Sequence, residues 1–400
     1  MATATKAKAT QVGPRELVER ARAFAPRLAE RARKAEELRA LPEETLRELH
    51  ESGLFRILQP KRFGGFETDL MTLVGCTAAL AEGCGSTSWV YANLASHHWM
   101  IGMWCDEAQQ EIWGENPDAG VSSSFAFPAG RGRKVPGGFR ITGRWPFSSG
   151  VDCAQWVMLA AIVEDTGEGR PGHRVFLVPK RELEVIYNWF VSGLAATGSK
   201  DVKAQDVFVP DYRAVDPADW RGGKSPGSGV NPGPLYRIPV LASFGFILTG
   251  TTLGLARAAW KLYADTTRTR LATYTGANVA DFPTVQIKVG EAATLIDLSG
   301  MVLMRDAEEM MGHAARGEVP DLDSRHRYRR NGTYSVKMCV DAVDLVVQAT
   351  GAKSLFIDNP MQRIFRDIHA AASHINLNWE IPAVSYGRIA LGLPPDNPMV

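Results

Sequence analysis

The sequence predicts an α+β fold in which a helical N-terminal domain, a central antiparallel β domain and a C-terminal helical bundle follow one another. Three patterns in the 400 residues support this order. Apolar residues recur at three- and four-residue spacings over about 14–118, short apolar or alternating runs follow Val121, and long helical patterns return over about 240–391. A chain of this length is expected to form roughly two or three structural units.

The N-terminal zone is predicted as a helical domain over 14–120, preceded by a flexible stretch over 1–13. Pro42 followed by Glu43 and Glu44 predicts a helix start, because proline is tolerated in the first turn and acids favour the positive end of the helix dipole. A later run, DLMTLVGCTAALAEGCGSTSWVYANLASHHWMIGMW, is richer in alanine and apolar residues, so we expect it to be more buried.

The central zone, over 121–221, is predicted as a small antiparallel barrel or sandwich. Its candidate strands are FRITGRW, WVMLAAIV, RVFLVP, LEVIYNW and VKAQDVFVP, separated by glycine and proline turns. A Gly/Pro/Ser-rich segment over 222–236 is predicted as a loop. Over 237–400, four long helical patterns with short connections predict a bundle, whose fourth helix starts near Pro360.

Composition and charge exclude several classes of protein. The net charge is +1, which argues against a sequence-independent nucleic-acid binder and against a polybasic membrane surface. No run of 18 or more apolar residues and no signal-peptide pattern is present, so we expect no membrane segment. The five cysteines are scattered without a CxxC pair, which favours a reducing cytoplasm over a disulfide framework or a zinc site.

Common nucleotide, nucleophile and metal motifs are absent or misplaced. No GxGxxG follows a strand and no GxxxxGK[ST] occurs, and the GxSxG match at 223–227 lies in the predicted loop. Glu309 and His313 are better explained as a solvated helix face. His369 and His374 are five residues apart, which places them on different sides of a regular helix. We therefore expect no metal site.

Four segments carry a resemblance to a known family. They are SSSFAFP (122–128), RWPFSSGVDCAQWVMLA (144–160), GLAATGSKDVKAQDVFVP (193–210) and QRIFRDIHAAASHINLNWE (362–380). With the α–β–α order they resemble the acyl-CoA dehydrogenase fold over nearly the whole chain. The further motifs LQPKRFGG, CGSTSWV, ASHHW, HAAASH and the tail GLPPDNPMV (392–400) resemble the oxygenase components of two-component flavin monooxygenases, of the hydroxyphenylacetate and secosteroid hydroxylase type.

The resemblance implies a chemistry and partners. In such oxygenases, reduced FMN or FAD arrives from a separate NAD(P)H:flavin reductase and reacts with O2 to a C4a-hydroperoxide, which hydroxylates a small aromatic, typically phenolic, substrate. The protein supplies placement, electrostatics and exclusion of water. The resemblance also implies a homotetramer with flavin contacts that cross between subunits.

The resemblance assigns roles to individual residues. Ser149 is the candidate hydrogen-bond donor at flavin N5, with Ser148 as the alternative. His374 is the candidate base or peroxide neighbour, since an imidazole suits proton handling near neutral pH. His97 is the candidate contact to the substrate hydroxyl, although a satisfied polar residue at a helix end is the alternative. The candidate cofactor-binding residues are Ser124, Trp145, Phe147, Ser148, Ser149, Thr197, Ser199, Arg270, Gln348, Gly351 and Arg366; those expected to bind substrate are His97, Ser124 and His374.

Several of these assignments have ordinary alternatives. Trp145 and Phe147 are also explained as strand core, and Arg270 as a helix-end charge. Arg366 and Asp367 are interpreted as a buried ion pair or as a flavin-contacting pair. His369 is interpreted as structural.

Two rival functions stay open. An acyl-CoA dehydrogenase would need a catalytic carboxylate, and HINLNWEIPA lacks the family's Tyr-Glu-Gly-Thr segment, with Glu380 the only acid nearby. A non-catalytic flavin carrier is the other. Ala195 and Ala196 stand where relatives often have an arginine before the TGS segment, which suggests a different phosphate anchor or a substrate without a carboxylate.

Overall fold

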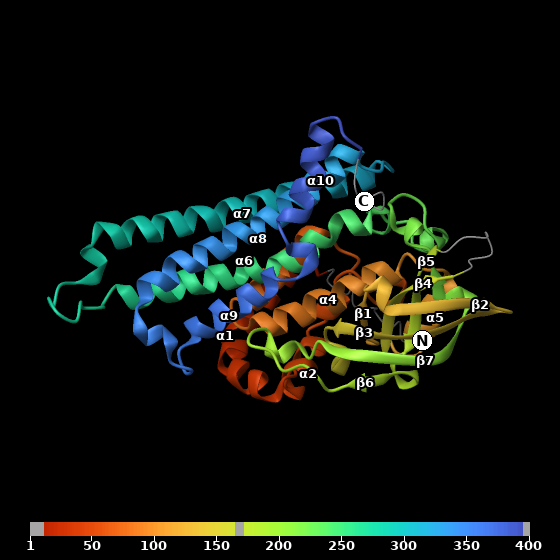
Figure 1. Ribbon diagram of the computed structural model, residues 1–400, viewed down its shortest axis with the longest axis horizontal. Helices are drawn as coiled ribbons and strands as arrows, with labels where there is room; N and C mark the ends of the chain where they lie inside the picture. The colour runs from red at the N-terminus through yellow and green to blue at the C-terminus, as the bar shows by residue number, and fades with distance from the viewer. Residues whose placement is uncertain (1–11, 165–171, 395–400) are drawn as a thin grey trace, which may run out of the picture.

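The computed structural model describes residues 12–164 and 172–394. Figure 1 shows an N-terminal group of helices, a β domain beside it and a long helical bundle that extends away from the sheet. This architecture confirms the predicted order and the acyl-CoA dehydrogenase-like fold class. Most of the predicted flexible start, and the tail motif beyond residue 394, lie outside the described residues.

The N-terminal helices differ in burial as the sequence predicts. They are α1 (Pro14–Leu38), α2 (Glu43–Glu51), α3 (Leu70–Ala81), α4 (Gly85–Ile101) and α5 (Asp106–Trp113). Helix α1 buries one apolar stripe that includes Leu17, Phe24 and Leu28, whereas nearly every residue of α3 and α4 is buried. Asp69 ends the preceding loop and accepts the N–H of Thr72 at 2.7 Å, so it caps α3.

The central sheet is mixed, which corrects the expectation of a purely antiparallel domain. Its strands are β1 (Val121–Ser124), β2 (Gly130–Val135), β3 (Gly138–Ser148), β4 (Trp156–Val163), β5 (Gly172–Pro179), β6 (Glu184–Ile186), β7 (Lys200–Pro210) and β8 (Ala214–Val215). Their order is β6-β7-β3-β2-β4-β5-β8, with β1 also on β4. Strands β1 and β2 lie one after the other along the same edge of β4 and run in the same direction as β4, so both pair with it in parallel.

The sheet has its own apolar core, and one predicted strand is short. Ile141, Trp145, Leu159 and Phe176 are fully buried in this core, so the alternating pattern of the strands specifies which face is covered. Of the predicted LEVIYNW strand, only Glu184–Ile186 pairs, antiparallel to β7.

The C-terminal bundle is built around α6. Its helices are α6 (Val240–Thr267), α7 (Pro283–Ala315), α8 (Leu322–Thr350), α9 (Pro360–Ala372) and α10 (Glu380–Ala390), so the predicted fourth helix is divided in two. By length and composition α6 could cross a membrane, but 83% of its most apolar 18-residue stretch is buried inside the molecule, as in a core helix.

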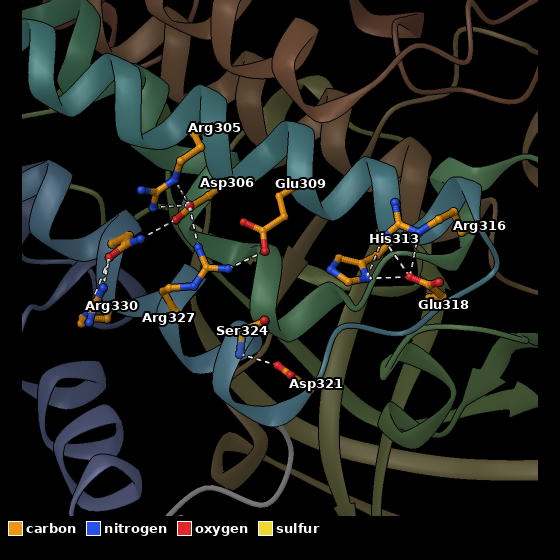
Figure 2. A network of polar contacts seen from close by, with 11 residues as sticks. Arg305, Asp306, Glu309, His313, Arg316, Glu318, Asp321, Ser324, Arg327 and Arg330 are labelled. Atoms are coloured by element: carbon orange, nitrogen blue, oxygen red, sulfur yellow. Dashed lines mark hydrogen bonds and ion pairs between the residues drawn. The ribbon is translucent and has the colours of Figure 1, made fainter.

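A polar network fixes α7 against α8 (Figure 2). The fully buried carboxylate of Asp306 accepts hydrogen bonds from Arg327 at 3.3 Å and from Asn331 at 2.6 Å. Arg327 also donates to Glu309 at 2.5 Å. Glu309 thus bridges the two helices while its side chain stays 35% exposed, in keeping with the solvated helix face that the sequence predicts. Buried charges need such partners, so the network sets how the two helices align.

Candidate active site

A buried row of hydroxyl groups brings together three residues that the sequence analysis selected. The Oγ atoms of Ser149 and Ser199 are 2.8 Å apart, and Ser199 Oγ lies 2.7 Å from Thr197 Oγ1. The indole Nε1 of Trp89 donates to Ser149 Oγ at 3.1 Å. Trp89 comes from α4, and although the CGSTSWV motif contains it, its role follows only from the structure. All four side chains are less than 10% exposed.

Two neighbouring turns hold this row in place. The N–H of Gly150 donates to the carbonyl of Thr197 at 2.9 Å. Lys200 Nζ donates to both carboxylate oxygens of Asp152, at 2.6 and 2.8 Å. Gly198 has a φ of +53°, and a Cβ there would lie 2.5 Å from the Asp152 carboxylate, so only glycine fits.

Phe147 and Trp145, both in strand β3, differ sharply in exposure. Phe147 adopts the left-handed conformation at a φ of +63°, and its side chain is 65% exposed directly before Ser148 and Ser149. Such a conformation is uncommon for a bulky residue outside glycine and often marks a functional site. Trp145 is fully buried in the sheet core and donates its Nε1–H to Ala160 O at 2.6 Å. The expectation that Trp145 stacks against the cofactor is therefore corrected, because its ring packs inside the domain.

The hydroxyl of Ser148 does not share the environment of Ser149. Ser148 is fully buried, and its Oγ has no hydrogen-bond partner among the described residues. Of the two adjacent serines, only Ser149 joins the row of hydroxyls. The geometry thus favours Ser149 over Ser148 as the serine that meets a ligand.

His374 lies beside Trp89, the tryptophan that donates to Ser149. Their ring centroids are 5.6 Å apart, with the rings nearly perpendicular. The N–H of Asn376 donates to His374 Nδ1 at 3.2 Å, so the neutral ring carries its proton on Nε2. Desolvation lowers the pKa of His374 to about 4. At neutral pH His374 is therefore a neutral hydrogen-bond donor at Nε2, and Trp89 links it to Ser149.

His97 has protein partners at both ring nitrogens. Its Nδ1 lies 2.6 Å from the carbonyl of Val121 and therefore carries the proton, so its Nε2 accepts the Ser123 hydroxyl at 3.0 Å. Burial lowers the pKa of His97 to about 4. Ser124, in contrast, donates to Pro146 O at 2.6 Å. Successive strand residues face opposite sides, so Ser123 contacts His97, whereas Ser124, which was expected to bind substrate together with His97, bonds to the backbone of β3. Strand alternation was the signal that would have identified the contact between Ser123 and His97.

Aromatic rings from three separate elements gather next to His97. Phe125, which follows β1, lies 6.3 Å from the His97 ring, 5.9 Å from Trp220 and 5.8 Å from Phe244, and each pair is close to perpendicular. Edge-to-face geometry is the favoured arrangement of such rings. This side of the candidate site is therefore apolar, with the Ser123–His97 pair as its polar end.

Arg270, Gln348 and Gly351 lie together, but far from Ser149 within one chain. Arg270 Nη1 donates to Ala349 O at 2.9 Å, and its Nη2 lies 3.1 Å from where a Gly351 Cβ would stand. Ser88, the neighbour of Trp89 in α4, contacts Thr251 of α6, and the 19 residues from Thr251 to Arg270, just past the end of α6, span about 28 Å at 1.5 Å per residue. Figure 1 places this end of the bundle away from the sheet.

Arg366 and Asp367 do not pair with each other, which corrects one interpretation. Arg366 Nη1 contacts Glu36 of α1 at 2.5 Å and the carbonyl of Ser192. Asp367 accepts the N–H of Leu194 at 2.6 Å. The two side chains therefore hold the start of the 193–199 segment against α9.

Asp367 and His369, both on α9, have environments that indicate structural roles. Burial raises the pKa of the Asp367 carboxyl to about 6. His369 lies 3.0 Å from Asp344 of α8, a helix-to-helix contact in keeping with a structural role. Over 12–164 and 172–394, no three His, Cys, Asp or Glu side chains converge as metal ligands would.

Two family models match the chain. Residues 14–116 match the N-terminal domain of acyl-CoA dehydrogenases, and residues 246–379 match their C-terminal domain. The chain is 36% identical over 373 residues to the oxygenase component of an FADH(2)-dependent resorcinol hydroxylase from Rhizobium sp., covering 91% of each. It is 32% identical to the oxygenase component of p-hydroxyphenylacetate 3-hydroxylase from Acinetobacter baumannii, over 99% of this chain and 94% of that one.

Solved structures agree with this similarity. A 3-HSA hydroxylase from Rhodococcus sp. RHA1 superposes with a TM-score of 0.91 at 32% identity, covering 96% of this chain and 99% of that one. XiaF from Streptomyces sp., in complex with FADH2 and glycerol, superposes with a TM-score of 0.89 at 31% identity, covering 97% and 98%.

Proposed function

Because the chain belongs to the acyl-CoA dehydrogenase family, and within it to the oxygenase components of flavin-dependent monooxygenases, we propose that it hydroxylates a small phenol with reduced FMN or FAD and O2. The relatives named after resorcinol and p-hydroxyphenylacetate support a phenolic substrate. A separate NAD(P)H:flavin reductase is the proposed source of reduced flavin, in line with the oxygenase-component names of these relatives.

The residues around Ser149 fit a flavin. The exposed ring of Phe147 offers an apolar surface to a flat ring system, and Ser149, two residues later in the chain, begins the row of hydroxyls. When bound, reduced flavin supplies the electrons that activate O2 for transfer to an aromatic ring. Ser149 would contact its N5, and His374 would donate from Nε2 to an oxygen atom held next to Trp89.

The substrate side is assigned to the aromatic rings and to Ser123. Phe125, Trp220 and Phe244 give apolar surfaces suited to an aromatic ring. Because Ser123 donates its proton to His97, its oxygen keeps lone pairs that can accept a phenolic O–H. With its pKa lowered to about 4, His97 acts as a fixed acceptor that orients Ser123, and does not store the proton itself.

A neighbouring copy of the chain is proposed to complete the flavin site. Leu355, Phe356 and Ile357, in the connection between α8 and α9, are 65–77% exposed, which is unusual for large apolar side chains next to each other. They adjoin Gly351 and Arg270, which lie too far from Ser149 to serve the same flavin within one subunit. In a homotetramer these residues could reach the phosphates of a flavin held by another copy.

The observation that carries the proposal is that Ser149 and His374 both contact Trp89, while the side chain of Phe147, two residues before Ser149, is exposed. The test supplies the purified chain with FMNH2 or FADH2, generated by NADH and a flavin reductase, in air. Resorcinol and 4-hydroxyphenylacetate are the first substrates. We expect a hydroxylated product whose yield per reduced flavin falls several-fold in Ser149→Ala, with matching extra H2O2.

Ser335→Ala is the matched control, because Ser335 is a fully buried serine in α8 whose Oγ has no partner among the described residues. Its yield should equal that of the wild type. Reduction of bound flavin by an acyl-CoA without O2, together with no hydroxylation of any phenol, would instead establish an acyl-CoA dehydrogenase. Flavin binding with neither reaction would indicate a carrier.

A further inference from the structure

The row of hydroxyls behind Ser149 has a defined direction. Thr197 Oγ1 donates its single proton to the carbonyl of Leu194 at 2.8 Å. Thr197 can therefore only accept from Ser199, 2.7 Å away, and Ser199 can in turn only accept from Ser149, 2.8 Å away. The order of donation is Ser149 to Ser199 to Thr197 to Leu194 O.

The acceptor at the end of this row is held firmly. The Leu194 carbonyl also receives the N–H of Thr197 at 3.1 Å and the indole N–H of Trp189 at 3.3 Å. Leu194 has a φ of +52°, and its own N–H is held by Asp367 at 2.6 Å. Because both the carbonyl and the N–H of Leu194 are hydrogen-bonded, the carbonyl keeps its orientation. It therefore sets the direction of donation along the whole row of hydroxyls.

The direction leaves Ser149 as an acceptor, which corrects the expectation that Ser149 donates a hydrogen bond to flavin N5. Its proton is donated to Ser199, and Trp89 Nε1–H occupies one of its two lone pairs at 3.1 Å. One lone pair remains for a ligand. N5 of a reduced flavin carries a proton, whereas N5 of an oxidised flavin carries a lone pair and no proton. An acceptor at Ser149 therefore attracts N5 of a reduced flavin and repels N5 of an oxidised flavin.

We propose that Thr197 and Ser199 are positioning residues that fix Ser149 as a hydrogen-bond acceptor and thereby make the site select reduced over oxidised flavin. This inference rests on the proposed flavin site and adds the residues that set its preference for one redox state. Thr197 and Ser199 act through Ser149.

Replacing Thr197 by valine tests the inference, because valine has the same shape and no hydroxyl. Ser199 then loses its acceptor and turns its proton toward Ser149, whose own proton becomes free to meet the lone pair of oxidised N5. The Kd values of FMN and of dithionite-reduced FMN are measured without O2, by ultrafiltration. The ratio of oxidised to reduced Kd should fall about tenfold in Thr197→Val, the worth of one buried hydrogen bond.

A second readout needs no turnover. Through the thermodynamic cycle, a tenfold fall in this ratio lowers the two-electron midpoint potential of bound FMN by about 30 mV. Thr197→Ser keeps a hydroxyl and should retain the wild-type ratio and potential. Thr77→Val is the matched control, since Thr77 is a fully buried threonine of α3 whose hydroxyl has no partner among the described residues.

The outcomes separate this inference from the proposed function. The directed row would be overturned, while the flavin site stands, in either of two cases. In the first, Thr197→Val keeps the wild-type ratio of oxidised to reduced Kd. In the second, Thr197→Ser lowers this ratio as much as Thr197→Val does. A wild-type chain that binds neither redox form of FMN or FAD would overturn both. A fall in the ratio of oxidised to reduced Kd that occurs only in Thr197→Val supports the inference.

Discussion

Replacing Asp367 by asparagine should stabilise the protein at neutral pH, although it removes a charged hydrogen-bond acceptor. Asp367 is 3% exposed, and burial, opposed by the Leu194 N–H and by Arg363 and Arg366, raises the pKa of its carboxyl from 3.8 to about 6. The native state thus prefers the protonated form. The group contributes stability below pH 3.8, and this contribution is lost as the pH rises through about 6.

The magnitude follows from the pKa change. A rise from 3.8 to about 6 corresponds to roughly 3 kcal/mol that the wild type loses by carrying the charge at neutral pH. Asparagine avoids this loss and keeps an oxygen for the Leu194 N–H, although the bond weakens when the acceptor is neutral. We therefore expect Asp367→Asn to be more stable by about 1–3 kcal/mol above pH 7, and similar to the wild type near pH 4.

Urea unfolding of both proteins at half-unit steps from pH 4 to pH 8 measures this directly. The difference in unfolding free energy cancels all other titrating groups. It should rise between about pH 4 and 6 and then level off. A variant that is less stable by the same amount at every pH would refute the reasoning, because burial of the charge would then not control this group.

Three further outcomes are expected. Desolvation lowers the pKa of His374 to about 4, so the native state disfavours protonation of this side chain. Its contribution to stability is therefore complete above pH 6.5 and is lost as the pH falls through about 4. The NMR signal of His374, identified by its absence in His374→Gln, should not titrate above about pH 5. Lys200→Met should cost about 1–3 kcal/mol in urea unfolding, since it leaves the partly exposed Asp152 unpaired, whereas the exposed Lys203→Met should cost less than about 0.5 kcal/mol. Asp306→Ala should cost roughly 3 kcal/mol or more, because Arg305, Arg327 and Asn331 all lose their buried acceptor and Arg327 keeps only Glu309. An equal cost in the exposed Glu318→Ala would contradict this.

The sequence specified the fold to the level of its zones. Periodicity separates the helices from the strands, and the helix start after Pro42 and the strand over Lys200–Pro210 lie where the patterns predict them. The parallel pairing of β1 with β4 was missed, because periodicity records which face of a strand is covered and not which strand lies beside it.

The candidate site was predictable only in part. Ser149, Thr197 and Ser199 were selected from short motifs, and the structure joins them into one row. The contact between Ser123 and His97 was not predicted, because two neighbouring serines look alike in the sequence and differ only in the face of β1 that each occupies. The placement of Trp145 in the core depends likewise on the sheet around it.

The sequence by itself determined which groups are present and in what local order: hydroxyls at a strand end, a histidine after a helix, an acid on α9. Tertiary structure alone decided their partners. Asp367 meets Leu194 across 173 positions of chain, and Trp89 meets Ser149 across 60. Local patterns reflect interactions within a few residues, whereas a buried donor or acceptor must find whatever partner packing brings to it. The direction of the hydroxyl row, and with it the acceptor character of Ser149, therefore exists only in the folded chain.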